Sequence, residues 1–225
     1  MKYLYETHMH TAEVSACAVS AAADQARAYK RRGYAGIIVT DHFINGNSVI
    51  PYNLQWDRQM KLFAAGYEKA KKEGDKLGLD VFFGWEFTIE GSDFLTYGLT
   101  PDFLLAHPGL DRLNIGEYSA LIRSAGGFIA QAHPYRSAPY IKNQFPAEPS
   151  LLDCVEVYNA SMPDDVNEKA RAFAERSGLL MQSGSDSHNT ELRFPSGVAL
   201  GKKADSIFDI IGAIKTGAAE MILPQ

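Results

Sequence analysis

The sequence predicts an α/β protein whose strands form a barrel covered by helices, and three observations support this fold class. Short apolar runs alternate with longer stretches of helical periodicity, which is the pattern of repeated βα units around a parallel sheet. Apolar runs such as AGIIVT and DVFFGW are nearly continuous, as in strands that are covered on both faces. The length of 225 residues suits one such barrel, so we expect a single domain over residues 1–225.

Seven apolar runs are expected to form strands, with helices between most of them. The strands cover residues 2–6, 35–40, 80–85, 94–99, 127–132, 154–158 and 179–183. The helices cover residues 15–32, 56–77, 116–125, 164–177 and 206–216. Ser15 is expected to cap the first helix, and Gly33 and Gly78 stand where the first two helices should end. The first helix is amphipathic and should therefore cover the outside of the barrel.

Residues 134–149 are expected to form a long loop. Four prolines in this stretch exclude a regular helix or a central strand. Loops of this length usually serve a site. The aromatic residues Tyr135, Tyr140 and Phe145 of this loop either form a wall for a substrate or pack onto the barrel.

The composition indicates an ordinary globular protein with an acidic surface. Hydrophobic residues make up 46% and charged residues 22% of the chain. The net charge of −5 argues against indiscriminate binding to nucleic acid or to anionic membranes. Two cysteines without C-x-x-C spacing indicate a reducing compartment, and the sequence shows neither a signal peptide nor a membrane span. We therefore expect a cytoplasmic protein that does not enter a membrane.

Most of the histidines directly follow expected strands. The chain has six histidines, and five of them occupy such positions: His8, His10, His42, His133 and His188. In a barrel of parallel strands, residues just beyond the strand ends gather at one mouth. A single histidine at a strand end is more often structural than a metal ligand, but five converging histidines favour a metal site. The sixth, His107, lies outside this pattern and is expected to be a surface or capping residue.

Two acidic residues extend this set. Glu86 follows the strand at residues 80–85, and Asp186 follows the strand at residues 179–183. Imidazole and carboxylate together bind zinc, manganese or iron, whereas calcium and magnesium prefer oxygen ligands alone. The sequence therefore predicts a site for divalent transition metals.

Four short motifs of the chain resemble those of the PHP (polymerase and histidinol phosphatase) domain, in the same order. They are the His-Met-His within residues 5–11, TDH at residues 40–42, AHP at residues 132–134 and SDSH at residues 185–188. The resemblance covers essentially the whole chain. It implies a distorted (β/α)7 TIM-like barrel, which agrees with the seven expected strands, and a centre of three divalent metals that hydrolyses phosphate esters.

The resemblance also implies which side chains hold each metal. His8, His10, Glu86 and Asp186 would surround the first metal. The second metal would share Glu86 and add His133. His42 and His188 would hold the third metal, together with a side chain from the loop after the first motif. Glu13 is expected to fill that position, and Cys17 is the alternative, whose thiolate would favour zinc.

Further side chains are candidates for contact with the substrate or with the ligands. Arg136 and Arg193 follow two of the histidine motifs and could clamp a phosphate, because the guanidinium offers paired donors. The general acid could be Asp186, His188 or a metal-held water.

Two roles are possible for each of three further polar residues. Asp41 either orients a ligand imidazole or caps the following turn. Glu156 and Asn159 resemble a recurrent PHP segment and could bind metal ligands or the substrate, whereas a buried glutamate paired with an arginine is the alternative.

The expected function is hydrolysis of a small phosphomonoester, similar to histidinol phosphate or a nucleotide, by a metal-activated water. Two alternatives remain: metal-dependent hydrolysis of an amide or lactone, and a metal-stabilised binding module without activity. The ligand types suit manganese, iron and zinc comparably. The sequence does not indicate the oligomeric state.

Overall fold

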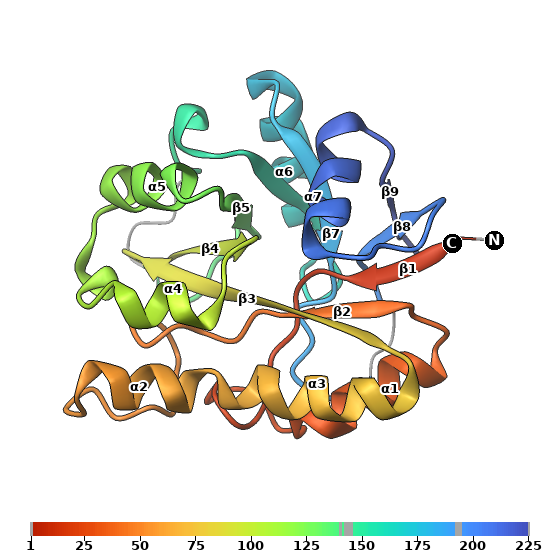
Figure 1. Cartoon of the computed structure of the whole chain (residues 1–225). Helices are drawn as coiled ribbons and strands as arrows, with labels where there is room; N and C mark the ends of the chain where they lie inside the picture. The colour runs from red at the N-terminus through yellow and green to blue at the C-terminus, as the bar shows by residue number, and fades with distance from the viewer. Residues whose placement is uncertain (1, 140, 142–145, 192–194, 225) are drawn as a thin grey trace.

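A computed structural model of the protein describes residues 2–139, 141, 146–191 and 195–224. Within these residues the fold is one mixed sheet curved into a nearly closed barrel, with helices packed around it (Figure 1). The strand order is β7-β6-β5-β4-β3-β2-β1-β8-β9. A parallel bridge between Met9 and Ser187 connects the chain beyond β1 with the chain beyond β7. The expected α/β barrel class is therefore confirmed.

All seven expected strands are present, and two short ones were not expected. The expected strands are β1 (Tyr3–Glu6), β2 (Gly36–Val39), β3 (Asp80–Ile89), β4 (Ser92–Tyr97), β5 (Phe128–Ala132), β6 (Cys154–Asn159) and β7 (Leu180–Gly184). The additional strands are β8 (Val198–Leu200) and β9 (Glu220–Met221). β8 pairs antiparallel with β1, and β9 pairs antiparallel with β8. They extend the sheet beyond β1.

The direction of β4 differs from the expected parallel arrangement. β4 runs antiparallel to both β3 and β5, whereas β1 to β3 and β5 to β7 are parallel. Only Glu90 and Gly91 separate β3 from β4, and both have positive φ angles, of 52° and 89°. A parallel connection needs a crossover of a dozen or more residues, so this spacing permits only a hairpin.

Seven α-helices are present in the described residues. They are α1 (Ala22–Arg31), α2 (Trp56–Phe63), α3 (Ala65–Leu77), α4 (Pro101–Ala106), α5 (Ile115–Ser124), α6 (Asp164–Ser177) and α7 (Ile207–Thr216). Two 3-10 helices, η1 (Leu110–Arg112) and η2 (Pro149–Leu151), complete the set. Helices α1, α2 and α3 lie along one side of the sheet (Figure 1). No described helix is both long and apolar enough to cross a bilayer.

Two expected helices have different bounds. The helix expected from Ser15 begins instead at Ala22, because the Ser15 hydroxyl donates to Asp41 rather than capping a helix. The helix expected over 56–77 is divided at Ala64, where α2 ends and α3 begins. The turns at residues 11–20 that replace the start of the first helix run along the mouth of the barrel.

The alternation of side chains along β3 separates the core from the site. Trp85 and Phe87 are fully buried in the hydrophobic core between the sheet and the surrounding helices. Trp85 Nε1 donates a hydrogen bond of 2.7 Å to the Tyr118 hydroxyl of α5. Successive side chains of a strand point to opposite faces, so Glu86 faces the other way. The packing of its two neighbours therefore fixes the direction of the Glu86 carboxylate.

Candidate metal centre

The structure brings seven of the eight expected ligand side chains together at one mouth of the barrel. His8 and His10 follow β1, His42 follows β2, Glu86 lies in β3, His133 follows β5, and Asp186 and His188 follow β7. All except His188 are buried. The carboxyl ends of the parallel strands meet here, as the barrel geometry requires.

Glu86 lies at the centre of this cluster. Its oxygens are 2.7 Å from His42 Nδ1, 3.3 Å from His133 Nε2, 3.4 Å from His8 Nε2 and 3.5 Å from His10 Nε2. Neither oxygen accepts a hydrogen bond of good geometry from the described residues, although the side chain is completely buried. A buried carboxylate without hydrogen bonds is costly unless a cation neutralises it. Divalent metal ions fit this requirement.

Asp186 is the second carboxylate of the cluster. Its Oδ1 lies 3.2 Å from His10 Nε2 and 3.4 Å from His8 Nε2, and its Oδ2 lies 3.8 Å from His133 Nε2. Asp186 has a φ angle of 52°, and His133 has a φ angle of 26°. Non-glycine residues rarely adopt positive φ, and such strained conformations concentrate at functional sites.

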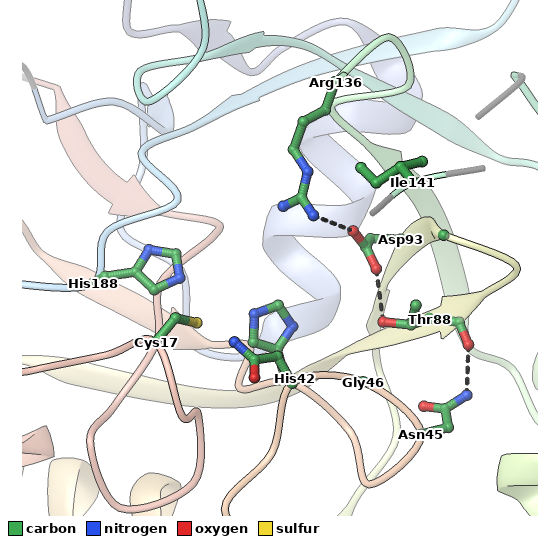
Figure 2. Close-up of a pocket in the computed structure, with 11 residues that line it drawn as sticks. Cys17, His42, Asn45, Gly46, Thr88, Asp93, Arg136, Ile141 and His188 are labelled. Carbon is green, nitrogen blue, oxygen red and sulfur yellow. Dashed lines mark hydrogen bonds and ion pairs between the residues drawn. The ribbon is translucent and has the colours of Figure 1, made fainter. Parts of the chain in front are cut away.

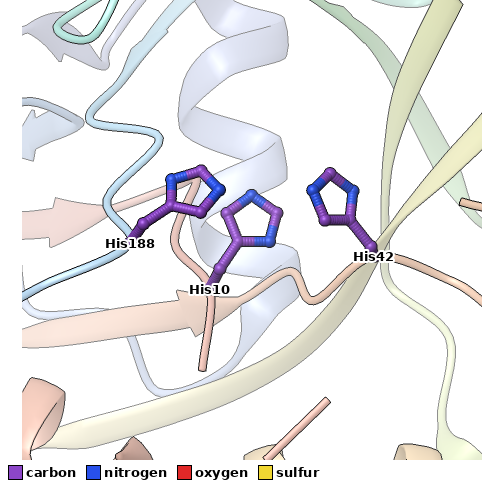
Figure 3. A group of neighbouring side chains, drawn as sticks. All are labelled: His10, His42 and His188. Atoms are coloured by element: carbon purple, nitrogen blue, oxygen red, sulfur yellow. The ribbon is translucent and has the colours of Figure 1, made fainter. Parts of the chain in front are cut away.

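Donor atoms gather in four groups, each compact enough to hold a metal ion. The groups are His10, His42 and His188; His8, His133 and Asp186; His8, His10 and Glu86; and Glu86, Asp93 and His133. Figure 3 shows the three imidazoles of the first group side by side. Each of the seven residues gathered at the mouth belongs to at least one group. The chain therefore offers ligands for several adjacent divalent ions.

Asp93 was not expected from the sequence. It stands opposite Thr88 in the β3–β4 hairpin and opposite Ala132 in β5, directly before His133. This position places its carboxylate with Glu86 and His133. The short Glu90–Gly91 turn could have predicted its position. Because this turn reverses the chain, β4 begins at the mouth of the barrel, whereas the parallel strands end there.

Charge within the cluster shifts the pKa values of its members. Burial would raise the pKa of Glu86 and Asp186, but the positive charges of the surrounding histidines outweigh it and hold both pKa values well below the usual range. Burial and the neighbouring charge of His42 lower the pKa of His10 to about 3. Asp93 has a raised pKa because of burial and the charge of Glu86. Ionised carboxylates and a neutral imidazole are the forms that bind metals.

Glu156 and Asn159 contact the side chains or backbone of three members of the cluster, His8, His133 and Asp186. Glu156 Oε1 lies 2.9 Å from His8 Nδ1, and its Oε2 accepts a 3.1 Å bond from the His133 backbone N–H. Asn159 Nδ2 donates to Glu156 at 2.9 Å and to Asp186 Oδ2 at 3.3 Å. These contacts fix the His8 ring so that its Nε2 faces the carboxylates. Carboxylate–histidine contacts of this kind typically orient metal ligands.

Asp41 acts on the cluster through Ser15. The carboxylate accepts hydrogen bonds from Thr11 N, Thr11 Oγ1 and Ser15 Oγ at 2.6 to 2.7 Å. Because Ser15 donates to Asp41, its oxygen can accept from His10 Nδ1 at 3.1 Å and from the His42 backbone N–H at 3.0 Å. Burial raises the Asp41 pKa to about 6. Asp41 thus contacts the turn at residues 11–15 rather than the turn that follows it, and it reaches His10 only through Ser15.

The structure does not bring Glu13 to the cluster. Its carboxylate accepts a 2.8 Å hydrogen bond from Ala22 N at the start of α1 and lies 3.5 Å from Lys69 Nζ. The expectation of Glu13 as a ligand therefore needs correction, because both oxygens face α1 and α3. Cys17 instead contacts His42 and His188, and their hydrogen bonds outweigh burial and lower its thiol pKa to about 6.

A cavity of about 540 Å³ opens beside the cluster (Figure 2). Cys17, His42 and His188 form one wall, and Asp93 and Arg136 form the other. The Arg136 guanidinium points into the cavity and lies 3.8 Å from Asp93 Oδ2. A cation on one wall and metal ligands on the other suit an anionic group between them.

The remaining candidates from the sequence either fall outside the described residues or are described away from the cavity. Arg193, Tyr140 and Phe145 fall outside the described residues. Tyr135 packs edge-on against Phe173 of α6 and does not line the cavity. His107 stacks on Phe103 at the end of α4 and contacts its carbonyl oxygen, which agrees with the expected structural role.

Comparison with known proteins identifies the fold. No family model and no curated protein sequence matches the chain. Among solved structures, a two-domain protein from Bacteroides vulgatus containing a predicted PHP-like metal-dependent phosphoesterase is similar, with a TM-score of 0.71 and 16% identity. The match covers 98% of this chain and 64% of that chain. The chain has the PHP fold.

Two further structures show how varied proteins with similar folds are. A sulfate-bound amidohydrolase from Chromobacterium violaceum has a TM-score of 0.59 and 15% identity, and the match covers 93% of this chain and 96% of that chain. The lesion-specific endonuclease EndoQ from Pyrococcus furiosus has a TM-score of 0.62 and 14% identity, with 99% of this chain and 58% of that chain covered. The present chain thus spans less than two thirds of the Bacteroides and Pyrococcus proteins. The comparisons therefore show the fold, and the structure adds a cluster of candidate metal ligands at its mouth.

Proposed function

We propose that the protein hydrolyses a small phosphomonoester at a centre of three divalent metals. The observation that carries this proposal is the cavity in which Arg136 faces the metal-ligand cluster. The reacting group of an amide or lactone is uncharged, whereas the reacting group of a phosphate ester is itself anionic and suits this guanidinium. The phosphoesterase named for the Bacteroides neighbour points to the same chemistry.

The proposed ligand sets follow the donor groups of the cluster. His8, His10, Glu86 and Asp186 would hold the first metal. Glu86, Asp93 and His133 would hold the second. His42 and His188 would contribute to the third. Bound divalent ions supply the positive charge that phosphate-ester hydrolysis needs and lower the pKa of water.

Arg136 is proposed to bind the phosphoryl oxygens of the substrate. Its planar guanidinium offers paired donors, and Asp93 lies near enough to orient it. The substrate's phosphoryl group would then lie between Arg136 and the wall formed by His42 and His188. Glu156 and Asn159 are proposed to act on the ligands rather than on the substrate, because their contacts are with His8, His133 and Asp186.

Asp186 and His188 are proposed to serve as ligands and not as proton donors. The low pKa of Asp186 leaves its carboxylate without a proton. His188 Nδ1 donates a 2.9 Å hydrogen bond to the Asp186 carbonyl oxygen, which would leave Nε2 as the atom that binds a metal. The proposal therefore assigns protonation of the leaving group to water.

The proposed reaction is tested with four chromogenic substrates. We expect the purified protein to hydrolyse p-nitrophenyl phosphate, to lose this activity on treatment with a chelator, and to regain it with manganese, zinc or iron. Bis(p-nitrophenyl) phosphate, p-nitrophenyl acetate and a p-nitroanilide serve as comparisons. Turnover of the diester alone would indicate a phosphodiesterase or nuclease, and turnover of the acetate or anilide alone would indicate an amidohydrolase. Bound metal without turnover of any of them would indicate a binding module.

Arg136→Ala is expected to raise KM for p-nitrophenyl phosphate roughly tenfold or more, because a charge-assisted contact to the phosphate is lost. Metal content should remain at the wild-type level, since Arg136 belongs to no ligand group. The exposed Arg112 provides the control, and Arg112→Ala should leave both quantities unchanged. An unaltered kcat/KM in Arg136→Ala would remove this residue from the substrate site.

A further inference from the structure

The two ends of the metal-ligand cluster differ in their donor atoms. At the end next to Arg136, Glu86 and Asp93 supply carboxylate oxygens and His133 supplies one nitrogen. At the opposite end, His10, His42 and His188 supply nitrogen alone. Cys17 stands beside this nitrogen-rich end and adds a sulfur atom to the same cavity wall. The cluster therefore changes from oxygen-rich to sulfur- and nitrogen-rich along its length.

Backbone hydrogen bonds hold the turn that carries Cys17 between the segments that carry His42 and His188. Ala16 N donates to the carbonyl of Asn47, in the segment after His42, at 2.8 Å. Val19 N donates to the carbonyl of His188 at 2.9 Å. The Cys17 side chain is thereby placed from both sides, without any contribution from its own sulfur. In Figure 2 the sulfur lies between the two imidazole rings.

The surroundings of the sulfur indicate a ligand position rather than an isolated thiol. The Cys17 sulfur lines the same cavity wall as His42 and His188. His42 is 7% exposed, and its Nδ1 has no hydrogen bond of good geometry within the described residues. Glu13, the competing oxygen donor of the same loop, faces Ala22 and Lys69. Of the two candidate donors in the loop after the first motif, Cys17 therefore lies beside His42 and His188, and Glu13 does not.

Donor type determines which metal each end prefers. Thiolate and imidazole together form the usual ligand set of zinc, with Zn–S distances of about 2.3 Å. Carboxylate-rich sites suit manganese and similar harder ions, and thiolates select against them. Two ends with such different donors are not expected to hold the same metal.

We propose that the metal centre is heterometallic. Cys17, His42 and His188 form a thiolate–imidazole site that selects zinc, and Glu86, Asp93 and His133 form an oxygen-rich site that takes manganese or iron. This inference rests on the multinuclear centre of the proposed function and adds the identity of its metals. A sulfur ligand at one end would mean that the protein needs two different metals, zinc at this site and manganese or iron at the other.

Cobalt substitution tests the sulfur ligand directly. A thiolate bound to Co²⁺ gives a charge-transfer absorption in the near ultraviolet, which imidazole and carboxylate ligands do not give. We expect this band in the cobalt-loaded wild type and its loss in Cys17→Ser and Cys17→Asp. The second cysteine, Cys154, is completely buried in β6 away from the cluster, so Cys154→Ala should retain the band. Absence of the band in the wild type would overturn the proposal.

Metal exchange tests the selectivity. After loading with zinc and extensive exchange against excess manganese, the wild type is expected to retain about one zinc per chain, as a thiolate–imidazole site would. Cys17→Asp should keep its total metal content but lose the retained zinc, since an oxygen ligand replaces sulfur. Complete exchange of zinc in the wild type, or equal zinc retention in Cys17→Asp, would contradict the selectivity.

The outcomes for this inference and for the proposed function are separable. A charge-transfer band and retained zinc in a protein that hydrolyses no phosphate ester would support the heterometallic centre and reject the phosphoesterase. Phosphate-ester hydrolysis without the band would support the phosphoesterase and reject sulfur ligation. Thermal unfolding of each variant shows whether it is folded, and Cys17 is only partly buried, so neither substitution removes core packing.

Discussion

Glu86→Gln is expected to lower kcat/KM for a phosphate ester by more than about 100-fold, beyond the 10- to 100-fold typical of lost ligand-orienting contacts. The same variant should lose at least one of its metals. Glu86 lies within 3.5 Å of four imidazoles, and the amide nitrogen of glutamine cannot bind a cation. Metal analysis and steady-state kinetics measure the two effects on one sample.

Glu90→Gln is the matched control for this substitution. Glu90 stands four residues later in the β3–β4 turn and is exposed, and it belongs to none of the donor groups. We expect wild-type metal content and wild-type turnover in this variant. Retention of all metals in Glu86→Gln would show that Glu86 is not a bridging ligand.

Glu6→Leu is expected to lower the free energy of unfolding by about 3 kcal/mol or more, because it leaves several buried donors without an acceptor. Glu6 is completely buried beneath the cluster. Its Oε1 accepts hydrogen bonds of 2.9 Å from the backbone N–H groups of Thr7, His8 and Ser185. Its Oε2 accepts from the Tyr29 hydroxyl at 2.6 Å and from the Ser185 hydroxyl. Denaturant unfolding of metal-free protein is the appropriate measurement, since bound metal adds stability of its own.

Glu6→Gln separates the hydrogen bonds from the charge. The amide oxygen can keep the three backbone donors, and the two hydroxyl groups can rotate to accept from the amide nitrogen. We therefore expect a loss of only about 1 kcal/mol, the value of a single neutral hydrogen bond. Burial raises the pKa of Glu6, which agrees with a neutral side chain being tolerated there. Equal destabilisation by leucine and glutamine would show that these hydrogen bonds contribute little.

The positions of the histidines were predictable because each depends on one local feature. His42 and His133 directly follow apolar runs, and the ends of parallel strands in a barrel meet at one mouth. Glu86 was predictable for the same reason, although β3 continues past it to Ile89. Strand identity was therefore sufficient to predict the centre of the cluster, and exact strand bounds were not needed.

The rest of the cluster depends on contacts between distant segments. The choice between Glu13 and Cys17 follows from the turns at residues 11–20, which Ser15 stabilises through Asp41, 26 residues away in the chain. The same contact explains why no helix begins at Ser15. Asp93 depends on the direction of β4, which the apolar run at residues 94–99 does not reveal. The pattern of apolar residues along a sequence predicts neither side-chain hydrogen bonds between distant segments nor the direction of a strand.

The β3–β4 hairpin also sets the spacing between two of the candidate metal ligands, Glu86 and Asp93. Its two-residue turn pairs Thr88 with Asp93, so the distance from Glu86 to Asp93 depends on turn length and not on the packing of any helix. One inserted residue would shift the register and rotate the Asp93 side chain to the opposite face of the sheet. In this protein a change of loop length, without the loss of any ligand from the sequence, would therefore change which metals the barrel can hold.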